Sequence, residues 1–311
     1  MSHKPLAFLN GRMIPAAELT IPVYDAGFVL GATVSEQLRT FGGKLYKLEE
    51  HLARLQRGLE ITGIDAGCSV EQLAASANEL AAANHRLLDP ADDLGLTIFI
   101  TPGPYATFAP PEVERRATIG MSTYALPFQL WADKYERGER LSTSGMRQVD
   151  KASWPRDMKH RSRMHYYLAD QAARRDHPGT RPLLLDKYGY VNETPTANVV
   201  AFRASEGIVS PPRSEILPGI TLAALAELSE SFGVPFVERS LSLDDLRSAD
   251  EAWLTSTPFC LLPVTQLDDA PIGDGRPGPV YRKLLEAWGK QVGFALPTQA
   301  QRFALRPATS S

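Results

Sequence analysis

The pattern of apolar and polar positions predicts strands and helices that alternate along the whole chain. Asn10-Gly11 joins two short apolar runs, and this pair readily adopts the positive φ angles of a tight hairpin turn. Leu52, Leu55 and Leu59 recur at helical spacing, which predicts an amphipathic helix. In the first half the expected strands and helices span residues 6–9, 12–14, 33–41, 44–48, 49–61, 69–88, 94–101 and 117–126.

The second half repeats this mixture of strands and helices. Helices are expected over residues 162–175 and 280–292, and another begins after Pro218-Gly219. The expected strands of this half span residues 182–186, 190–193, 198–203 and 252–255. Short hairpin connections argue against a purely parallel sheet, so the pattern predicts a mixed α/β or α+β fold.

The length of the chain predicts two domains, because 311 residues exceed one typical domain and fall short of three. The periodicity weakens over residues 127–138, which we interpret as a linker. It would join an N-terminal domain at residues 1–126 to a second domain at residues 139–296. The polar stretch at residues 297–311 is expected to be a tail.

Composition and charge exclude several classes of function. A net charge of -3 gives no basic surface for nucleic acid or for an anionic membrane. No apolar stretch approaches the roughly 20 residues of a membrane-spanning helix, and the first ten residues do not resemble a signal peptide. Cys68 and Cys260 lie far apart without a Cys/His cluster, which suits a reducing compartment and offers no metal site. These features predict a cytoplasmic protein.

Residues with catalytic chemistry recur in separate blocks of the sequence. A lone lysine or arginine is usually a solvated side chain, so the order and spacing of the blocks matter more than any single residue. The blocks are Tyr24-Asp25-Ala26-Gly27-Phe28-Val29-Leu30-Gly31 with Val34-Ser35-Glu36-Gln37-Leu38-Arg39, His51-Leu52-Ala53-Arg54-Leu55, Met158-Lys159-His160-Arg161-Ser162-Arg163, residues 184–193 and 197–200, Glu215-Ile216-Leu217-Pro218-Gly219-Ile220-Thr221, and Leu254-Thr255-Ser256-Thr257-Pro258.

In order and local context these blocks resemble the fold-type IV pyridoxal-phosphate enzymes. That family includes the branched-chain and D-amino-acid aminotransferases, the (R)-selective amine transaminases and the aminodeoxychorismate lyases. The resemblance covers about Leu6 to Val292. It implies a smaller N-terminal α/β domain, a larger C-terminal β-barrel-like domain with helices, pyridoxal 5'-phosphate as the cofactor, and a homodimer. The first block looks like the family's first active-site strand.

The resemblance identifies Lys159 as the catalytic lysine that holds pyridoxal phosphate as a Schiff base. A primary amine is required for this bond and, once released by substrate, can move the α-proton. Glu193 would lie beside the pyridine nitrogen and keep it protonated, so that the ring accepts electrons. Lys151 is the nearby competitor, but it precedes Trp154-Pro155 and lacks the run into a helix that follows Lys159.

Further residues are implied to bind the cofactor phosphate or its ring. A guanidinium such as that of Arg54 can make two charge-assisted hydrogen bonds to a phosphate. A helix that begins after a glycine offers backbone N–H groups to an anion. The other cofactor-binding residues implied by the resemblance are Leu217 on the ring and Ile220, Thr221, Ser256 and Thr257 on the phosphate side. Pro258 departs from the family pattern, because it has no N–H to donate.

The substrate-facing positions also depart from the family pattern. Arg39 stands where amino-acid transaminases place a basic residue, which favours a substrate with a carboxylate. Ser35 replaces a common bulky aromatic residue, and Met164 stands where the L-branched-chain enzymes usually have a tyrosine. The loop at residues 101–111 has no arginine, and its Tyr105 either lines the pocket or packs on the surface.

These features favour a transaminase that moves an amino group between an amino acid or amine and a 2-oxo acid, of the D-amino-acid type or an atypical member. An (R)-selective amine transaminase stays open, and the L-branched-chain assignment is weakened. A lyase of the aminodeoxychorismate lyase type is the alternative, although the threonine of those lyases is missing where Glu36 and Gln37 stand. A non-catalytic scaffold is hard to reconcile with Arg54, Lys159 and Glu193 together.

Overall fold

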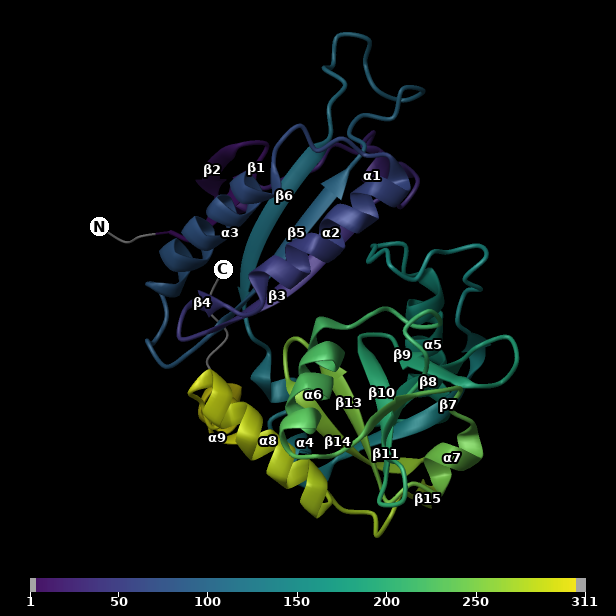
Figure 1. Ribbon diagram of the computed structural model, residues 1–311. Coiled ribbons are helices and arrows are strands. Elements are labelled where there is room, and N and C mark those ends of the chain that lie inside the picture. The colour runs from purple at the N-terminus through teal and green to yellow at the C-terminus, as the bar shows by residue number, and fades with distance from the viewer. Residues whose placement is uncertain (1–3, 306–311) are drawn as a thin grey trace. The chain divides into compact units, whose positions relative to one another are not determined.

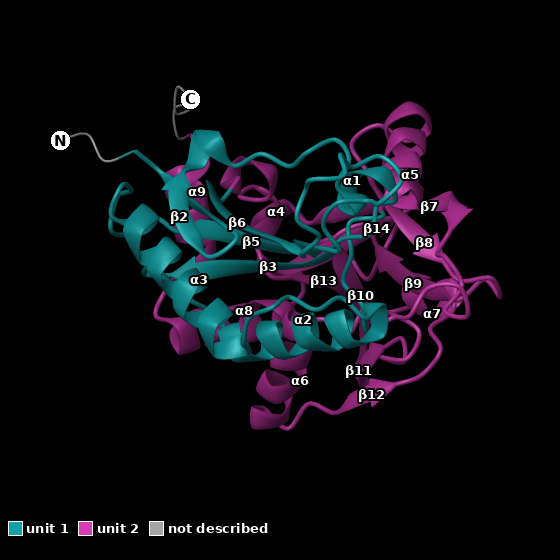
Figure 2. Ribbon diagram, turned by 90° about the horizontal axis from the view of Figure 1, so that it is seen from above, with its two compact units in different colours: residues 1–126, 157–162 teal, residues 127–156, 163–311 magenta. Residues whose placement is uncertain are grey.

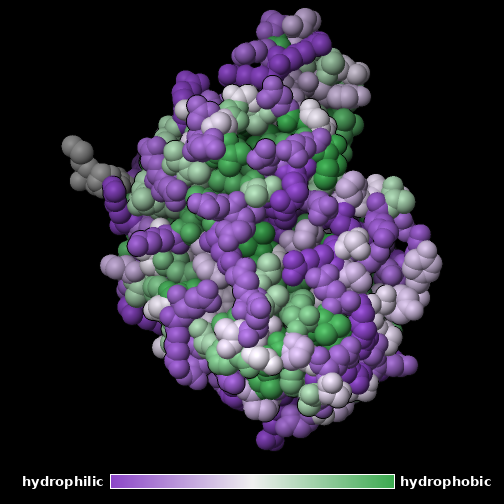
Figure 3. All heavy atoms as spheres, in the orientation of Figure 1, coloured by the Kyte–Doolittle hydropathy of each residue, from purple (hydrophilic) through white to green (hydrophobic). Residues whose placement is uncertain are grey.

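The computed structural model describes residues 4–305 of the chain. These residues form two compact units, which Figure 2 colours separately. Unit 1 comprises the residues up to Leu126 together with residues 157–162, and unit 2 comprises residues 127–156 and the described chain from Arg163 onward. Hydrophilic side chains cover much of the face seen in Figure 3, with smaller apolar areas between them. None of the helices within residues 4–305 is long and apolar enough to cross a membrane.

Unit 1 is a six-stranded antiparallel sheet with helices α2 and α3 on one face (Figure 1). The strand order is β2-β1-β6-β5-β3-β4. The strands are β1 (Leu6–Leu9), β2 (Arg12–Pro15), β3 (Val34–Phe41), β4 (Lys44–Leu45), β5 (Leu94–Thr101) and β6 (Thr118–Ala125). The helices are η1 (Ala16–Glu18), α1 (Ala26–Val29), α2 (Leu48–Thr62) and α3 (Val70–His85).

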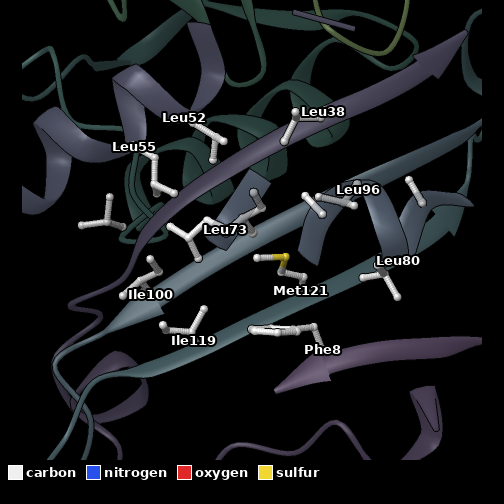
Figure 4. Close-up of a cluster of buried hydrophobic side chains, with 14 of the residues drawn as sticks. Phe8, Leu38, Leu52, Leu55, Leu73, Leu80, Leu96, Ile100, Ile119 and Met121 are labelled. Carbon is white, nitrogen blue, oxygen red and sulfur yellow. The ribbon is translucent and has the colours of Figure 1, made fainter. Parts of the chain in front are cut away.

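The core of unit 1 lies between this sheet and the two long helices. Leu52 and Leu55 of α2 and Leu80 of α3 pack against Leu38 and Leu96 of the sheet, as Figure 4 shows. Full burial of each leucine side chain contributes about 1.5–3 kcal/mol to folding. The leucines at helical spacing in the helices and the alternating apolar residues of the strands therefore face each other and form one core.

Unit 2 contains a nine-stranded sheet of order β12-β11-β10-β13-β14-β7-β8-β9, with β15 paired to β14. Because β9 also pairs with β10, six of these strands close into a barrel. The strands are β7 (Glu139–Arg147), β8 (Arg181–Leu185), β9 (Val191–Thr194), β10 (Ala197–Arg203), β11 (Gly207–Ser210), β12 (Phe236–Glu238), β13 (Glu251–Ser256), β14 (Cys260–Leu267) and β15 (Ala270–Pro271). The helices are η2 (Phe128–Leu130), α4 (Lys134–Arg137), α5 (Met164–Asp176), α6 (Ile220–Ser231), α7 (Leu243–Arg247), α8 (Pro279–Val292) and α9 (Leu296–Ala304).

The mixed α/β class and the barrel-like second part of the chain are confirmed, whereas some local expectations need correction. The block that begins at Tyr24 does not enter the sheet directly, because residues Ala26–Val29 form α1. The Asp25 carboxylate caps this helix by accepting a hydrogen bond from the Gly27 N–H at 2.7 Å. The strand of the first block therefore begins only at Val34.

Two strands of the barrel were not predicted. Strand β14 is apolar over most of its length but contains Pro263, which interrupts a strand pattern. Strand β7 is largely polar and pairs in parallel with β8 and β14, which are distant in the sequence. Strand β7 has no local hairpin partner on which a sequence pattern could depend, whereas β14 pairs with β13 across a short turn.

The expected linker and tail both contain regular structure. Residues 127–138 hold η2 and α4 and belong to unit 2. Most of the expected tail that is described lies in α9, whose Leu296, Ala300 and Phe303 are buried at helical spacing. The Phe303 ring lies 6.2 Å from that of Phe128, which ties α9 to η2 within unit 2. Residues 306–311 of the expected tail lie outside the described residues.

Candidate active site

A buried cluster of charged side chains joins β3 to α2 in unit 1. Glu36 accepts hydrogen bonds from Arg54 Nε at 2.7 Å and from Arg54 Nη2 at 2.8 Å, and the His51 Nδ1 atom lies 2.7 Å from its Oε2. The three residues are between 0% and 3% exposed. The paired nitrogens of a guanidinium match the two oxygens of a carboxylate, so this ion pair has the geometry that a buried pair needs.

The charges within this cluster are fixed by its contacts. Burial alone would raise the pKa of Glu36, but the Arg54 guanidinium and the His51 ring outweigh burial and hold this pKa far below its usual value. Burial lowers the pKa of His51, and the charges of Arg54 and Lys159 lower it further. The Glu36 carboxylate raises this pKa but does not offset the other effects. His51 is therefore a neutral imidazole that donates its Nδ1 hydrogen to the Glu36 carboxylate.

Lys159 is attached to the strand that carries Glu36. His160 forms an antiparallel bridge with Val34, and the Ser35 N–H donates to the Lys159 carbonyl at 2.9 Å. The Arg161 N–H donates to the Thr33 carbonyl at 3.0 Å. Residues 157–162 therefore extend the sheet of unit 1 beside the start of β3, although they are distant in sequence from the rest of that unit.

The register of this pairing places the Lys159 and Arg161 side chains on one face of the sheet. Opposed residues of an antiparallel pair point to the same face, and neighbours along a strand alternate. Lys159 and Arg161 consequently share a face with Ser35, and His160 and Glu36 share the other. The face that carries Lys159 is the one not covered by α2 and α3.

A pocket of about 540 Å³ lies in unit 1 where Arg161 meets the sheet. Strand β5 contributes Thr97 and Phe99 to its lining, which share a face with Gln37 and Ser35 by register. The other lining residues are Ile21, Val23, Gly27, Phe28, Thr33, Thr101, Ser122 and Arg161. Hydroxyl groups, apolar side chains and one guanidinium thus surround a space of the size of typical small-molecule sites.

A second cluster in unit 2 surrounds Glu193 of β9. The Tyr166 hydroxyl donates to Glu193 Oε1 at 2.6 Å, and the Gln148 amide donates to the same oxygen and to the Tyr166 hydroxyl. Burial, reinforced by the charge of Glu193, raises the pKa of Tyr166 well above its usual value, so the phenol remains protonated. Glu193 is only 6% exposed and is positioned by these two donors.

Neither Gln148 nor Tyr166 was identified from the sequence. The position considered there, Met164, is 68% exposed at the start of α5. A signal for Tyr166 was present, because it shares its helix face with the buried Ala169 and Ala173 at positions i, i+3 and i+7. Gln148 lies in an irregular segment after β7 and has no comparable signal.

The first turn of α6 in unit 2 allows another group to come close to its backbone. Its N-cap residue is Gly219, and no side chain caps the helix. A Cβ atom at Gly219 would lie 2.1 Å from Asn198 Oδ1, so only glycine fits beside that amide. Asn198 in turn donates to the Leu217 carbonyl at 3.0 Å. The first-turn N–H groups, which include those of Ile220 and Thr221, have no acceptors within the helix.

The turn that joins β13 to β14 lies in the same unit. The Thr255 hydroxyl is buried without a hydrogen-bond partner. The Ser256 hydroxyl donates to the Thr196 carbonyl at 2.7 Å, which fixes the start of the turn, and Thr257 is half-buried within it. The buried Thr255 hydroxyl and the polar groups of this turn could therefore contact a ligand.

The three residues expected to contact substrate have different surroundings. The Arg39 side chain is 1% exposed, its Nη2 lies 3.7 Å from Asp93, and its guanidinium lies over the Phe41 ring. Arg39 is therefore better explained as an internal counter-ion of Asp93 than as a substrate ligand. Tyr105 packs edge-on against Phe108 at 5.6 Å, and Ser35 is buried beneath the pocket face.

Each unit, taken by itself, carries groups suited to a phosphorylated cofactor with a reactive carbonyl. Unit 1 offers the primary amine of Lys159 and the guanidinium of Arg54. Unit 2 offers the carboxylate of Glu193, the uncapped N-terminus of α6 and the orphaned hydroxyl of Thr255. A helix N-terminus and hydroxyls suit a phosphate, and a buried carboxylate suits a protonated ring nitrogen, so these residues fit pyridoxal phosphate.

Comparison with known proteins agrees with this assignment. The family model described as "Amino-transferase class IV" matches residues 33–267. The D-alanine aminotransferase of Bacillus licheniformis is 30% identical over 281 residues, which cover 89% of this chain and 94% of the relative. The branched-chain amino acid aminotransferase of Escherichia coli has the same fold, with 22% identity and a TM-score of 0.82 over 92% of this chain and 94% of that chain.

The fold and the two clusters define a pyridoxal-phosphate enzyme of fold type IV. The chain belongs to the class IV aminotransferase family, and it is a pyridoxal-phosphate-dependent aminotransferase. The T.th. branched-chain amino acid aminotransferase, whose structure holds pyridoxamine 5'-phosphate, is 23% identical and has a TM-score of 0.83 over 96% of this chain and 97% of that chain.

Proposed function

We propose that this aminotransferase acts on D-amino acids and 2-oxo acids, with Lys159 as the catalytic lysine. The observation that supports Lys159 most strongly is its pairing with β3, which holds its backbone on an ordered strand and turns its side chain to the face that also carries Arg161. The alternatives, Lys151 and Lys187, are exposed side chains paired with Glu215 and Asp150.

The residues around Lys159 have separable tasks in this proposal. The Lys159 amine would hold the cofactor and, once free, would carry the substrate α-proton. Glu36 engages the Nε and Nη2 atoms of Arg54. Glu36 thereby fixes the orientation of the guanidinium before the phosphate arrives, which lowers the entropic cost of binding.

Unit 2 carries further groups that suit the cofactor. When bound, pyridoxal phosphate would supply an electron sink for the substrate α-carbon. Glu193, held by Tyr166 and Gln148, keeps a proton on the ring nitrogen. The α6 N-terminus with Ile220 and Thr221, together with Ser256 and Thr257, binds the phosphate, and Leu217 packs on the ring.

The preference for D-amino acids is supported by the D-alanine aminotransferase of Bacillus licheniformis, which this chain resembles along 94% of that relative's length. The test is a set of half-reactions with the purified, cofactor-loaded protein. D-alanine, L-leucine and (R)-1-phenylethylamine are each added, and the loss of the visible absorbance of the lysine-bound cofactor is followed. D-alanine is expected to react fastest, and a faster reaction of L-leucine would contradict the proposal.

The same experiment separates transamination from lyase chemistry. A transaminase needs a 2-oxo acid to return its cofactor to the starting form, whereas a lyase releases pyruvate from a suitable substrate without an acceptor. Turnover that requires an acceptor supports the transaminase. We also propose a homodimer in the cytoplasm, as the family resemblance implies, and light scattering of the purified protein tests the dimer.

A further inference from the structure

The pocket of unit 1 contains a charged group that none of the roles above uses. Of its lining residues within the described part of the chain, Arg161 alone carries a formal charge, and its side chain is exposed. The other polar groups of the lining are hydroxyls, among them those of Thr33, Thr97 and Ser122. A guanidinium and several hydroxyl groups around one pocket are hydrogen-bond donors of the kind that suits an anionic ligand.

The position of Arg161 relative to Lys159 follows from the backbone pairing. Both residues oppose β3, and both side chains leave the sheet on the same face. Residues two apart on a strand lie roughly 7 Å apart, a distance comparable to the length of either side chain. A molecule of the size of an amino acid can therefore reach both the Lys159 amine and the Arg161 guanidinium.

The electrostatic surroundings of the pocket face support the same ligand. The Tyr124 hydroxyl accepts a hydrogen bond from the Gln37 side-chain amide, and burial raises the pKa of this tyrosine. The charges of Arg161 and Arg39 act on that hydroxyl in the opposite direction, which places both cations near it. Because Asp93 offsets the charge of Arg39, the positive potential of the pocket face comes from Arg161 and Lys159, which share that face.

We propose that Arg161 binds a carboxylate of the substrate in this pocket and thereby selects amino acids and 2-oxo acids over simple amines. The inference rests on the proposed function and identifies the specificity-determining residue of that site. It explains how the protein recognises a carboxylate although Arg39 is buried against Asp93 and the loop at residues 101–111 contains no arginine.

The first experiment measures equilibrium binding of unreactive ligands by calorimetry. Propionate, glutarate and the neutral propionamide are titrated into the purified wild-type protein and into the Arg161→Gln and Arg161→Lys variants. Loss of one charged hydrogen-bonded contact is expected to weaken carboxylate binding about 10- to 100-fold in Arg161→Gln. Arg161→Lys recovers part of that affinity because it keeps the charge, and propionamide binding is unchanged.

The ligand pair distinguishes which carboxylate Arg161 holds. Equal weakening of propionate and glutarate in Arg161→Gln indicates the carboxylate at the α-carbon. If Arg161→Gln instead removes only the affinity by which glutarate exceeds propionate, Arg161 binds the side-chain carboxylate of an acidic substrate. Arg57→Gln is the matched control, because Arg57 is an exposed arginine of α2 in the same unit and does not line the pocket. This control is expected to bind all three ligands like the wild type.

Half-reaction kinetics provide the second readout. Arg161→Gln should raise the concentration of amino acid needed for half-maximal reaction and leave that of (R)-1-phenylethylamine unchanged. Unchanged carboxylate binding in Arg161→Gln, or absence of carboxylate binding in the wild type, overturns the inference even if transamination occurs. Failure of the wild type to bind the cofactor refutes the proposed function instead, and the ligand titrations still decide the role of Arg161.

Discussion

Glu36 holds Arg54 through two hydrogen bonds of 2.7 and 2.8 Å inside unit 1, where neither side chain reaches solvent. Removal of one partner of such a buried pair leaves an uncompensated charge. We expect Glu36→Gln to lower the free energy of unfolding by about 3–5 kcal/mol, measured by denaturant titration of the cofactor-free protein.

Glu50→Gln is the control for this prediction. Glu50 pairs with Lys47 at the exposed start of α2, where an ion pair contributes about 0–1 kcal/mol. Equal losses in the two variants would show that the buried pair does not carry the stability attributed to it. Glu36→Gln should also weaken phosphate binding at Arg54, because the guanidinium loses its fixed orientation.

His51 makes the stability of the protein depend on pH. Its pKa is lower in the folded protein than in the unfolded chain, mainly because it is buried, so the unfolded chain takes up the proton first. Stability is therefore complete above the unfolded value of about 6.5 and falls as the pH drops from there toward the folded pKa. His51→Asn keeps a donor for Glu36 without a titrating group. The difference between the two unfolding-versus-pH curves should grow below pH 6.5, and parallel curves would exclude this role.

The Tyr166 hydroxyl is expected to act through Glu193 rather than on the substrate. Tyr166→Phe removes a charged hydrogen bond to the carboxylate, which should reduce kcat about 10-fold with little change in KM. A change in the absorbance of the bound cofactor should accompany the loss, since the environment of its ring nitrogen changes. Tyr167→Phe, at an exposed position of the same helix, should leave both quantities unchanged. A purely structural role of Tyr166 would lower stability without the spectral change.

The sequence predicted what depends on local order and missed what depends on contacts between distant residues. Leu52 and Leu55 gave α2 its period, and Asn10-Gly11 gave the first hairpin its turn. Arg54 was identified within its motif. Glu36 lies on a different element, so no local sequence pattern indicates the hydrogen bonds between Glu36 and Arg54. Polar contacts of this kind are set by tertiary packing, which periodicity does not describe.

The substrate side of the site shows the same limit. Arg39 was selected because of its position on a strand, and only the structure shows that Asp93, on the adjoining segment before β5, neutralises it. Arg161 was visible in the lysine motif, but its position on the pocket face depends on the pairing of residues 159–161 with β3. Strand alternation could have placed it there only if that pairing were known.

The assignment of Lys159 predicts one site of covalent attachment. Reduction of the cofactor-loaded protein with borohydride, followed by digestion and mass spectrometry, should place the adduct on Lys159. Lys159→Ala should lose both the adduct and the visible absorbance. Lys151→Ala should retain both, because Lys151 is exposed and paired with Glu215. An adduct on Lys151 in the wild type would overturn the assignment.

Gly219 tests whether the N-terminus of α6 binds the phosphate. A methyl group at this position would lie 2.1 Å from Asn198 Oδ1, so Gly219→Ala must displace either the helix start or the amide that holds Leu217. We expect a loss of stability of about 1–3 kcal/mol from the overpacking and, in addition, a weaker affinity for pyridoxal phosphate. Gly145→Ala is the control, since a Cβ atom there meets nothing within 4 Å. Cofactor affinity measured on folded Gly219→Ala protein separates the two effects. Affinity equal to that of the wild type would show that the backbone of this turn does not contact the phosphate.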